Sequence, residues 1–459
     1  MYKIDFSKPC HAHLIGIGGS SMSGLAEYLL QKGFTVSGSD RDLNASTKKL
    51  EAHGAKILLG QSADNITDDI DFVIYTAAIH PDNPEYHAAE TAGIPMLSRA
   101  QFLGQMMAQH HDSFAVSGTH GKTTTTSMIA HILLEADTDP TISIGGKLDA
   151  IGGNIRSGES DVFLVEACEY TNSFLELHPM YSIILDIEED HPDFFKDLAD
   201  IRNSFRLFLE NTHPDGAVIL NSEIPDPEEL TQNVDAKTIF YGLSGNEAYT
   251  ARNITYNENG FAAFTIVIDG KDAGDVQLNI PGEHNVANAL AAIAATHQFG
   301  IAVEDMIRGL ESFGGAIRRF QHRGVWNGVT IMDDYAHHPT EIRVTLEAAR
   351  NVPHNRLIAV FQPFTYSRTK AYWQDFIDAL SLADLVILPD VMAARETDTL
   401  GVRSEDLAAD IMKAGTECYH VATFPEIEKF LEKKSMNNDL LITMGCGDVY
   451  RLADLLVGE

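Results

Sequence analysis

The chain has 459 residues, of which 44% are hydrophobic and 22% charged, a composition typical of a globular protein. Asp and Glu number 66 against 33 Lys and Arg, which gives a net charge of −33. This charge argues against binding to nucleic acid or to an anionic membrane, because both favour basic surfaces. At about 150 residues per domain, the length predicts three domains.

Cysteine usage and hydropathy indicate the compartment. The four cysteines, Cys10, Cys168, Cys418 and Cys446, lack metal-ligand spacing, and a chain of this size does not need disulfides. The sequence shows no basic-then-apolar leader, and no apolar run approaches the roughly 18 residues of a membrane span. We therefore expect a cytoplasmic protein with free thiols.

The first third of the chain alternates strand and helix patterns. A strand, a glycine-rich loop, a helix and a second strand follow one another at 13–17, Gly18-Gly19-Ser20-Ser21, 25–31 and 34–38. Asp40 stands just beyond the second strand. The unit resembles a dinucleotide fingerprint with Ser21 at the third glycine position, which alone indicates no more than a nucleotide diphosphate. With further elements at 72–75, 94–97 and 100–109, residues 1–106 read as a small parallel α/β domain.

The central region opens with a second glycine-rich segment, Gly118-Thr119-His120-Gly121-Lys122-Thr123-Thr124, between an apolar strand and a helical pattern. Backbone N–H groups at such a helix start bind phosphate, Lys122 adds a positive charge, and Thr123 offers a hydroxyl to Mg²⁺. The spacing departs from the standard phosphate loop, since Val116 stands where the first glycine is expected. An ordinary glycine turn is the alternative. The order of strand, Gly-Lys-Thr and helix favours a nucleoside triphosphate.

Two later strands end in side chains that can bind metals. The strand over 162–165 ends in Glu166, and the strand over 181–185 is followed by a run of acids and His191. The carboxyl ends of parallel strands share one edge of a sheet, where the phosphate loop also lies. Carboxylate and imidazole groups there suit Mg²⁺ beside a triphosphate. Helix capping is the alternative role.

The rest of the central domain, expected over residues 107–313, contains a hairpin and a long helix. An alternating segment over 262–268, after Asn259-Gly260, predicts an antiparallel hairpin added to the main sheet. An Ala-rich helix follows, and Asn285 and Asn288 share one of its faces. Their amides can meet a base edge or a phosphate, or they can cap the helix.

Residues 314–459 form the third expected domain, an α/β unit of Rossmann type. Strands are expected at 329–332, 357–361, 385–388 and 440–444. Polar residues stand before the first of these strands and at its end: Arg318, Arg319, Asp333, Asp334 and His337.

Together the motifs occur in one order: GIGGSSMSG, GTHGKTTT, EACEY, EEDH, GEHNVAN, RRFQ, DDYAHHPTE and FQPFTYSRT. In this order the chain resembles the Mur ligase family over nearly its whole length. The resemblance implies an N-terminal Rossmann-like domain for a UDP-sugar, a central ATPase domain with a parallel sheet and a small antiparallel part, and a C-terminal Rossmann-like domain. It further implies an ATP- and Mg²⁺-dependent ligase, monomeric or homodimeric, in peptidoglycan synthesis. The expected reaction joins L-alanine to UDP-N-acetylmuramic acid through an acyl phosphate.

The same resemblance implies residue roles. The expected catalytic residues are Lys122, His191 and Arg319, and the expected Mg²⁺ ligands are Thr123, Glu166 and His191. The groups expected at ATP are Gly118, Thr119, His120, Gly121, Lys122, Thr123, Thr124, His284, Asn285, Asn288, Arg319, Asp333 and His337. The groups expected at the UDP-sugar are Gly18, Gly19, Ser20, Ser21, Asp40 and His80.

Departures from the usual motifs leave two alternatives open. Cys168, Thr171 and Phe364 differ from the family's common residues and bear on amino-acid choice rather than on the reaction class. One alternative is a relative that attaches a ready-made peptide to the same UDP-sugar, with the pocket around Arg395 and Glu396 as the discriminating feature. The other is a nucleotide-binding regulator without turnover, which predicts missing metal ligands.

Overall fold

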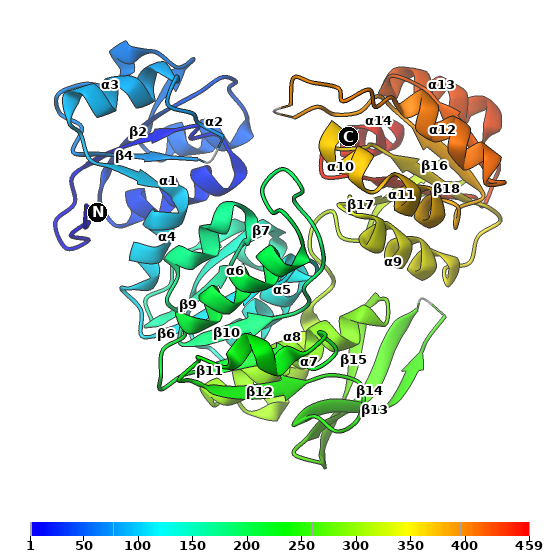
Figure 1. The fold of residues 1–459 in the computed structure, drawn as a ribbon, viewed down its shortest axis with the longest axis horizontal. Coiled ribbons are helices and arrows are strands. Elements are labelled where there is room, and N and C mark those ends of the chain that lie inside the picture. The colour runs from blue at the N-terminus through cyan, green and yellow to red at the C-terminus, as the bar shows by residue number, and fades with distance from the viewer. Residues whose placement is uncertain (1, 77, 259, 395, 459) are drawn as a thin grey trace. The chain divides into compact units, whose positions relative to one another are not determined.

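The computed structural model describes residues 2–76, 78–258, 260–394 and 396–458 (Figure 1). Asn259 and Arg395, named above, lie outside the described residues. Three β-sheets with helices between their strands confirm the expected mixed α/β fold of three domains. The chain forms two compact units, the first made of Met1–Asp186, Arg202–Phe240 and Ala291–Gly309 and the second of Ile187–Ile201, Tyr241–Leu290 and Leu310–Glu459.

The N-terminal sheet, in the first unit, has five parallel strands in the order β3-β2-β1-β4-β5. Its strands are β1 (His11–Ile15), β2 (Thr35–Asp40), β3 (Lys56–Leu59), β4 (Phe72–Tyr75) and β5 (Met96–Ser98). Its helices are α1 (Ser20–Gln31), α2 (Ala45–Ala52), α3 (Pro84–Ala92) and α4 (Arg99–Met107), with a 3₁₀ turn, η1, at Ala63–Asn65. The strand order reverses at β1, and in such sheets the loops at this point bind ligands.

Two element boundaries in this domain differ from expectation. Helix α1 begins at Ser20 rather than at residue 25, because the backbone N–H of Ser23 already bonds to Gly19 and its hydroxyl bonds to Ser20. Asp40 is the last residue of β2 rather than a residue beyond it, since it pairs with Leu59 of β3. The predicted loop is therefore shorter than the sequence pattern indicated.

The first unit also contains seven strands of the central sheet, in the order β12-β11-β10-β6-β9-β7-β8. They are β6 (Asp112–Ser117), β7 (Thr141–Leu148), β8 (Gly153–Arg156), β9 (Val162–Glu166), β10 (Tyr181–Ile184), β11 (Ala217–Asn221) and β12 (Lys237–Tyr241). Strands β9, β6, β10 and β11 are parallel, and most of their residues are buried, as is typical of parallel sheets. The helices of this region are α5 (Lys122–Glu135), α6 (Leu198–Glu210), α7 (His284–Phe299) and α8 (Val303–Ser312), and the 3₁₀ turns are η2 (Asp149–Ile151), η3 (Tyr170–Glu176) and η4 (Pro227–Thr231).

The second unit holds the antiparallel part and the C-terminal sheet. The predicted hairpin is confirmed as three antiparallel strands, β13 (Tyr249–Tyr256), β14 (Phe261–Ile268) and β15 (Lys271–Pro281). The C-terminal sheet has the order β16-β17-β21-β18-β19-β20, in which only β16 is antiparallel. Its strands are β16 (Gln321–Trp326), β17 (Val329–Asp334), β18 (Leu357–Phe361), β19 (Leu385–Leu388), β20 (Glu417–His420) and β21 (Leu440–Met444). Its helices are α9 (Pro339–Arg350), α10 (Tyr366–Ala371), α11 (Trp373–Leu380), α12 (Ser404–Lys413), α13 (Phe424–Lys434) and α14 (Tyr450–Val457).

The C-terminal sheet is covered on both faces. One buried cluster packs β18 and β21 against α9, α11 and α12, and a second packs the other face against α13 and α14. The four cysteines, all of them described, are free. None of the described helices combines the length and the apolar character that crossing a membrane requires.

Candidate active site

The phosphate loop folds around the amine of Lys122, the first residue of α5. Gly118 (φ 148°) and Gly121 (φ 77°) take backbone conformations that favour glycine. The Lys122 Nζ donates to the carbonyl oxygens of Gly118 and Thr119, the second across 2.9 Å. The loop thus holds one cation at the start of a helix, which is the arrangement expected of an anion site.

The charge of Lys122 is balanced by Glu169, a buried residue whose Oε2 lies 3.0 Å from Nζ. Burial disfavours the charged amine, but the carboxylates of Glu169 and Glu166 outweigh this effect and hold the pKa of Lys122 above its ordinary value. Burial and the Glu169 charge raise the pKa of the neighbouring Cys168 thiol to about 11. At neutral pH the lysine is therefore charged and the thiol is not.

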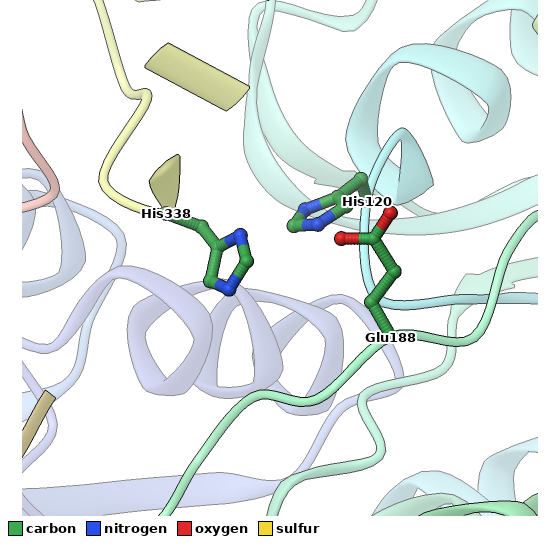
Figure 2. A group of neighbouring side chains, drawn as sticks. All are labelled: His120, Glu188 and His338. Atoms are coloured by element: carbon green, nitrogen blue, oxygen red, sulfur yellow. The ribbon is translucent and has the colours of Figure 1, made fainter. Parts of the chain in front are cut away.

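Asp186, which stands two residues after β10, also holds the backbone of the phosphate loop. Its Oδ1 accepts a hydrogen bond from the N–H of His120 across 2.8 Å (His120 is drawn in Figure 2). A Cβ at Gly118 would lie 2.8 Å from the same oxygen, so only glycine fits there. Sequence reasoning assigned no specific role to Asp186, although its place just after a parallel strand was a usable signal.

Thr123 and Glu166, the predicted metal pair, do lie together. The Thr123 hydroxyl donates to Glu166 Oε2 across 2.9 Å, and the Gly145 N–H donates to the same oxygen, also across 2.9 Å. Hydroxyl and carboxylate oxygens are the protein ligands that Mg²⁺ prefers, usually with waters and phosphates completing its shell. The residues present therefore fit a magnesium ion beside the phosphate loop, and Thr124 follows in the same helical turn.

The glycine-rich loop of the N-terminal domain contacts Asp40, which was expected beside it at the UDP-sugar. The N–H of Gly18 donates to Asp40 Oδ2 across 2.8 Å, which leaves no space for a side chain at Gly18. Gly19 is the N-cap of α1 and has no side-chain cap. His80 lies after β4 with an exposed side chain, and its carbonyl accepts from the N–H of Asn83.

Two residues that sequence reasoning missed contact this loop. Asn154, from β8, donates to the carbonyl oxygen of Ser20 across 2.6 Å, and Arg99 donates from Nη1 to the Ser21 hydroxyl across 3.1 Å. Both are far from the loop in the sequence, so no local pattern connects them to it.

In the second unit His191 belongs to a buried charge network. The Asp190 carboxylate accepts hydrogen bonds from Nε and Nη2 of Arg368, across 3.1 and 2.8 Å, and from the N–H of His191. Burial opposes the Asp190 charge, but Arg368 and the nearby histidines outweigh it and hold the pKa of this carboxyl below its ordinary value. His191 itself has a left-handed backbone (φ 53°), a strained conformation common at functional sites. Arg368 stands in the FQPFTYSRT motif, but sequence reasoning gave it no role.

The start of α9 and the segment before His191 line a pocket of about 350 Å³. His338, the N-cap of α9, accepts from the N–H of Thr340, whose hydroxyl donates to Glu188 across 2.8 Å (Glu188 and His338 are drawn in Figure 2). The pocket wall carries both signs of charge, since Arg343 lines it together with Glu188, Glu189 and Asp375. Mixed charge of this kind suits a zwitterion.

The two arginines of the RRF motif have different surroundings. Arg318 donates to Asp333 Oδ2 and to the carbonyl oxygens of Gly445 and Gly447. Arg319 lies over the Tyr335 ring, with its Nη1 3.8 Å from Glu341.

The remaining predicted groups of this unit occupy two helix starts. Asn285 and Asn288 are buried, and the Asn288 amide donates to Asn285 Oδ1 across 3.0 Å. Desolvation and the Arg319 charge lower the pKa of His284 to about 4, so its ring is neutral at pH 7. His337 packs edge-on against Tyr335, and its N–H donates to Glu341 across 3.0 Å.

Three domain families match the chain in sequence order. They are the Mur ligase family catalytic domain over residues 11–111, the Mur ligase middle domain over 116–296, and the Mur ligase glutamate ligase domain over 318–447. Their order and extent agree with the three sheets.

Individual relatives resemble the chain over its full length. It is 56% identical to a UDP-N-acetylmuramate–L-alanine ligase of Agathobacter rectalis and 53% identical to one of Lachnospira eligens, with 100% of each chain covered. A crystal structure of a UDP-N-acetylmuramate-alanine ligase of Thermotoga maritima superposes with a TM-score of 0.82, at 31% identity and with 98% of each chain covered. The chain therefore belongs to the Mur ligase family and is an ATP-dependent ligase of peptidoglycan synthesis.

Proposed function

We propose that this chain joins L-alanine to the carboxylate of UDP-N-acetylmuramate, at the expense of ATP. The observation that supports this most directly is the Thr123–Glu166 pair, 2.9 Å apart, next to the buried Lys122 amine. These three groups suit Mg²⁺ and the terminal phosphates of ATP. Residues 1–106 would hold the UDP-sugar, 107–313 the ATP, and 314–459 the groups that complete the site.

The reaction needs an activated acid, because a carboxylate has no leaving group that an amine can displace. Transfer of the γ-phosphoryl group to the carboxylate forms an acyl phosphate and ADP. The uncharged amine of alanine then attacks the carbonyl carbon of the acyl phosphate. Inorganic phosphate leaves, and the nitrogen loses one proton to give the amide. Such a sequence needs positioning and charge neutralisation more than covalent help from the protein.

Several side chains would supply this help. Lys122 would bind the β- and γ-phosphates, and Thr123 and Glu166 would hold Mg²⁺, which neutralises phosphate charge when bound. As the family resemblance implies, Arg319 would contact the phosphates and His191 would bind a second metal near the acid. Asn285, Asn288 and His284 would face the nucleotide, and Asp333 and His337 would complete the C-terminal domain's part of the ATP site.

The UDP-sugar would lie on the loop Gly18-Gly19-Ser20-Ser21, near Asp40 and His80. Because ATP and nucleotide-activated sugars are made in the cytoplasm, we propose that the reaction takes place there.

A phosphate-release assay tests the proposal. UDP-N-acetylmuramate is supplied with L-alanine, L-serine, glycine or a ready-made tripeptide, and the products are identified by mass. We expect the highest turnover with L-alanine and a product mass equal to both substrates less one water. Turnover with the tripeptide alone would assign the chain to peptide attachment, and ATP binding without any turnover would assign it to regulation.

The surroundings of Glu396 bear on the choice between alanine addition and peptide attachment. Its carboxylate accepts hydrogen bonds from the N–H groups of Tyr366 and Ser367, across 2.5 and 3.1 Å, so it fixes the start of α10. A carboxylate engaged in this way favours a structural role over recognition of a peptide amine.

A further inference from the structure

Arg99, the first residue of α4, has no carboxylate partner among the described residues. Its Nη1 donates to the Ser21 hydroxyl across 3.1 Å. In the described part of the chain no carboxylate lies within ion-pair distance of it. A guanidinium has five N–H donors. The chain has twice as many acidic as basic residues, so a lack of carboxylates in the chain does not explain why Arg99 has no acidic partner among the described residues.

The position of Arg99 in its helix is locally unfavourable. It stands in the first turn of α4, where the helix dipole disfavours a positive charge, and that turn contains no acidic residue to offset it. Residues that break a local rule without a compensating contact are expected at functional sites. An anionic ligand would supply the missing partner.

The helix that begins with Arg99 also packs against the segment that follows Glu169, the partner of Lys122. Helix α4 touches η3 so closely that a Cβ at Gly104 would lie 2.2 Å from the carbonyl oxygen of Glu176. The η3 turn directly follows Cys168 and Glu169, and the latter pairs with Lys122. The Arg99 charge also acts on the Cys168 thiol, lowering its pKa against the larger opposite effect of burial. Arg99 therefore contacts the Ser21 loop, and its charge also acts on Cys168, the neighbour of Glu169 in the chain.

We propose that Arg99 binds the carboxylate of the UDP-sugar substrate and orients it for phosphoryl transfer. This inference rests on the proposed function, in which the sugar's acid must lie between the same two loops. A guanidinium binds a carboxylate through two parallel N–H···O bonds and fixes its plane. Each carboxylate oxygen has two lone pairs, so one remains for the bond to phosphorus.

Binding and turnover of two variants, Arg99→Met and Arg99→Lys, test this role. Calorimetry compares UDP-N-acetylmuramate with UDP-N-acetylglucosamine, which has the same nucleotide and sugar ring but lacks the carboxylate. We expect Arg99→Met to weaken the first ligand about 30-fold and the second less than about twofold, because only the first loses a charged hydrogen-bonded pair. The KM for UDP-N-acetylmuramate rises and kcat falls, while the KM for ATP stays within about twofold. Arg99→Lys keeps the positive charge but lacks the two parallel N–H donors of a guanidinium, so we expect its affinity for UDP-N-acetylmuramate to lie between those of Arg99→Met and the unmodified protein.

A matched control is Arg252→Met, since Arg252 lies on β13 and pairs with Asp272 across 3.3 Å. It should bind both UDP-sugars like the unmodified protein. If Arg99→Met weakens both UDP-sugars equally, Arg99 serves the diphosphate or the loop and the inference is wrong. Unchanged affinity for both would overturn it too.

The binding measurements do not need turnover, so they stay informative if alanine proves to be the wrong amino acid. If Arg99→Met does not fold, as judged by its thermal melt, Arg99→Lys carries the same comparison. Equal affinity of Arg99→Lys and the unmodified protein for UDP-N-acetylmuramate would then count against the proposal.

Discussion

Nε of Arg318 donates a hydrogen bond to Oδ2 of the buried Asp333 across 2.9 Å. The same guanidinium lies over two rings, 5.1 Å from the centre of Tyr335 and 4.6 Å from that of Tyr450. Arg319, which stands between two residues with left-handed backbone (Arg318, φ 61°, and Phe320, φ 49°), lies over the same Tyr335 ring but has Glu341 rather than Asp333 as its acidic neighbour. Two adjacent arginines thus have separate roles, since Arg318 holds the C-terminal sheet and its loops together.

We predict that Arg318→Met and Arg319→Met separate stability from catalysis. Loss of Arg318 leaves the Asp333 carboxylate buried without its cation, which costs about 3–5 kcal/mol of unfolding free energy. Loss of Arg319 should change stability little and reduce kcat/KM by about 10² or more. Urea unfolding and phosphate release measure the two effects. Equal destabilisation by both substitutions would contradict the separation.

Lys122 and Glu169 form a pair that complicates the usual phosphate-loop experiment. Lys122→Ala removes the phosphate-binding amine, but it also removes the cation beside the buried Glu169 carboxylate and the hydrogen bonds to two loop carbonyls. We therefore expect it to lose about 3–5 kcal/mol of stability as well as turnover. The double variant Lys122→Met/Glu169→Gln should regain most of that stability and remain inactive.

Thermal melts and phosphate release distinguish these outcomes. If Lys122→Ala melts like the unmodified protein, the pair contributes nothing to the fold. Turnover by the double variant near the original rate would instead remove the role proposed for Lys122.

Much of this architecture could be predicted from sequence periodicity. Strands such as β19 and β21 stand where their apolar runs predicted. Thr123 contacts Glu166 because Glu166 ends the parallel strand β9 and Thr123 lies in the helix that follows the neighbouring strand β6. The contacts of Arg99 and Arg368 could not be predicted. They join residues 78 and 178 positions apart, and neither periodicity nor turn chemistry contains information about pairs at such separations.

Glu166 permits a direct test of the metal site. Glu166→Gln keeps the side-chain length and one acceptor oxygen but removes the charge that Mg²⁺ requires. We predict that half-maximal activity needs about 10–100 times more Mg²⁺. A titration of phosphate release with Mg²⁺ at saturating ATP measures this shift.

Gly145 offers a second approach that leaves the ligand itself intact. A Cβ at Gly145 would lie 2.5 Å from Glu166 Oε1, so Gly145→Ala should displace the carboxylate and raise the Mg²⁺ requirement in the same direction. An unchanged Mg²⁺ dependence in both variants would exclude Glu166 as a ligand.

Asp334 should make stability depend on pH in an unusual direction. Burial raises the pKa of this carboxyl to about 6, against the opposing effects of Arg319 and of the N–H groups of Ala336 and Phe320. The unfolded chain titrates near 3.8, so between about pH 4 and pH 6 the folded protein binds the extra proton. The stabilisation is complete below pH 3.8 and is lost as the pH rises through about 6. The shift corresponds to roughly 3 kcal/mol at most.

The measurement compares the unmodified protein with Asp334→Asn, which mimics the protonated carboxyl at every pH. Urea unfolding from pH 7.5 down to pH 4.5 should show the unmodified protein gaining stability relative to the variant as the pH falls. Asp190→Asn is the matched control, because the pKa of Asp190 lies below its ordinary value and its contribution is constant until the pH falls below about 4. A difference between the unmodified protein and Asp334→Asn that stays flat, or that grows with rising pH, would show that this carboxyl remains ionised throughout the range.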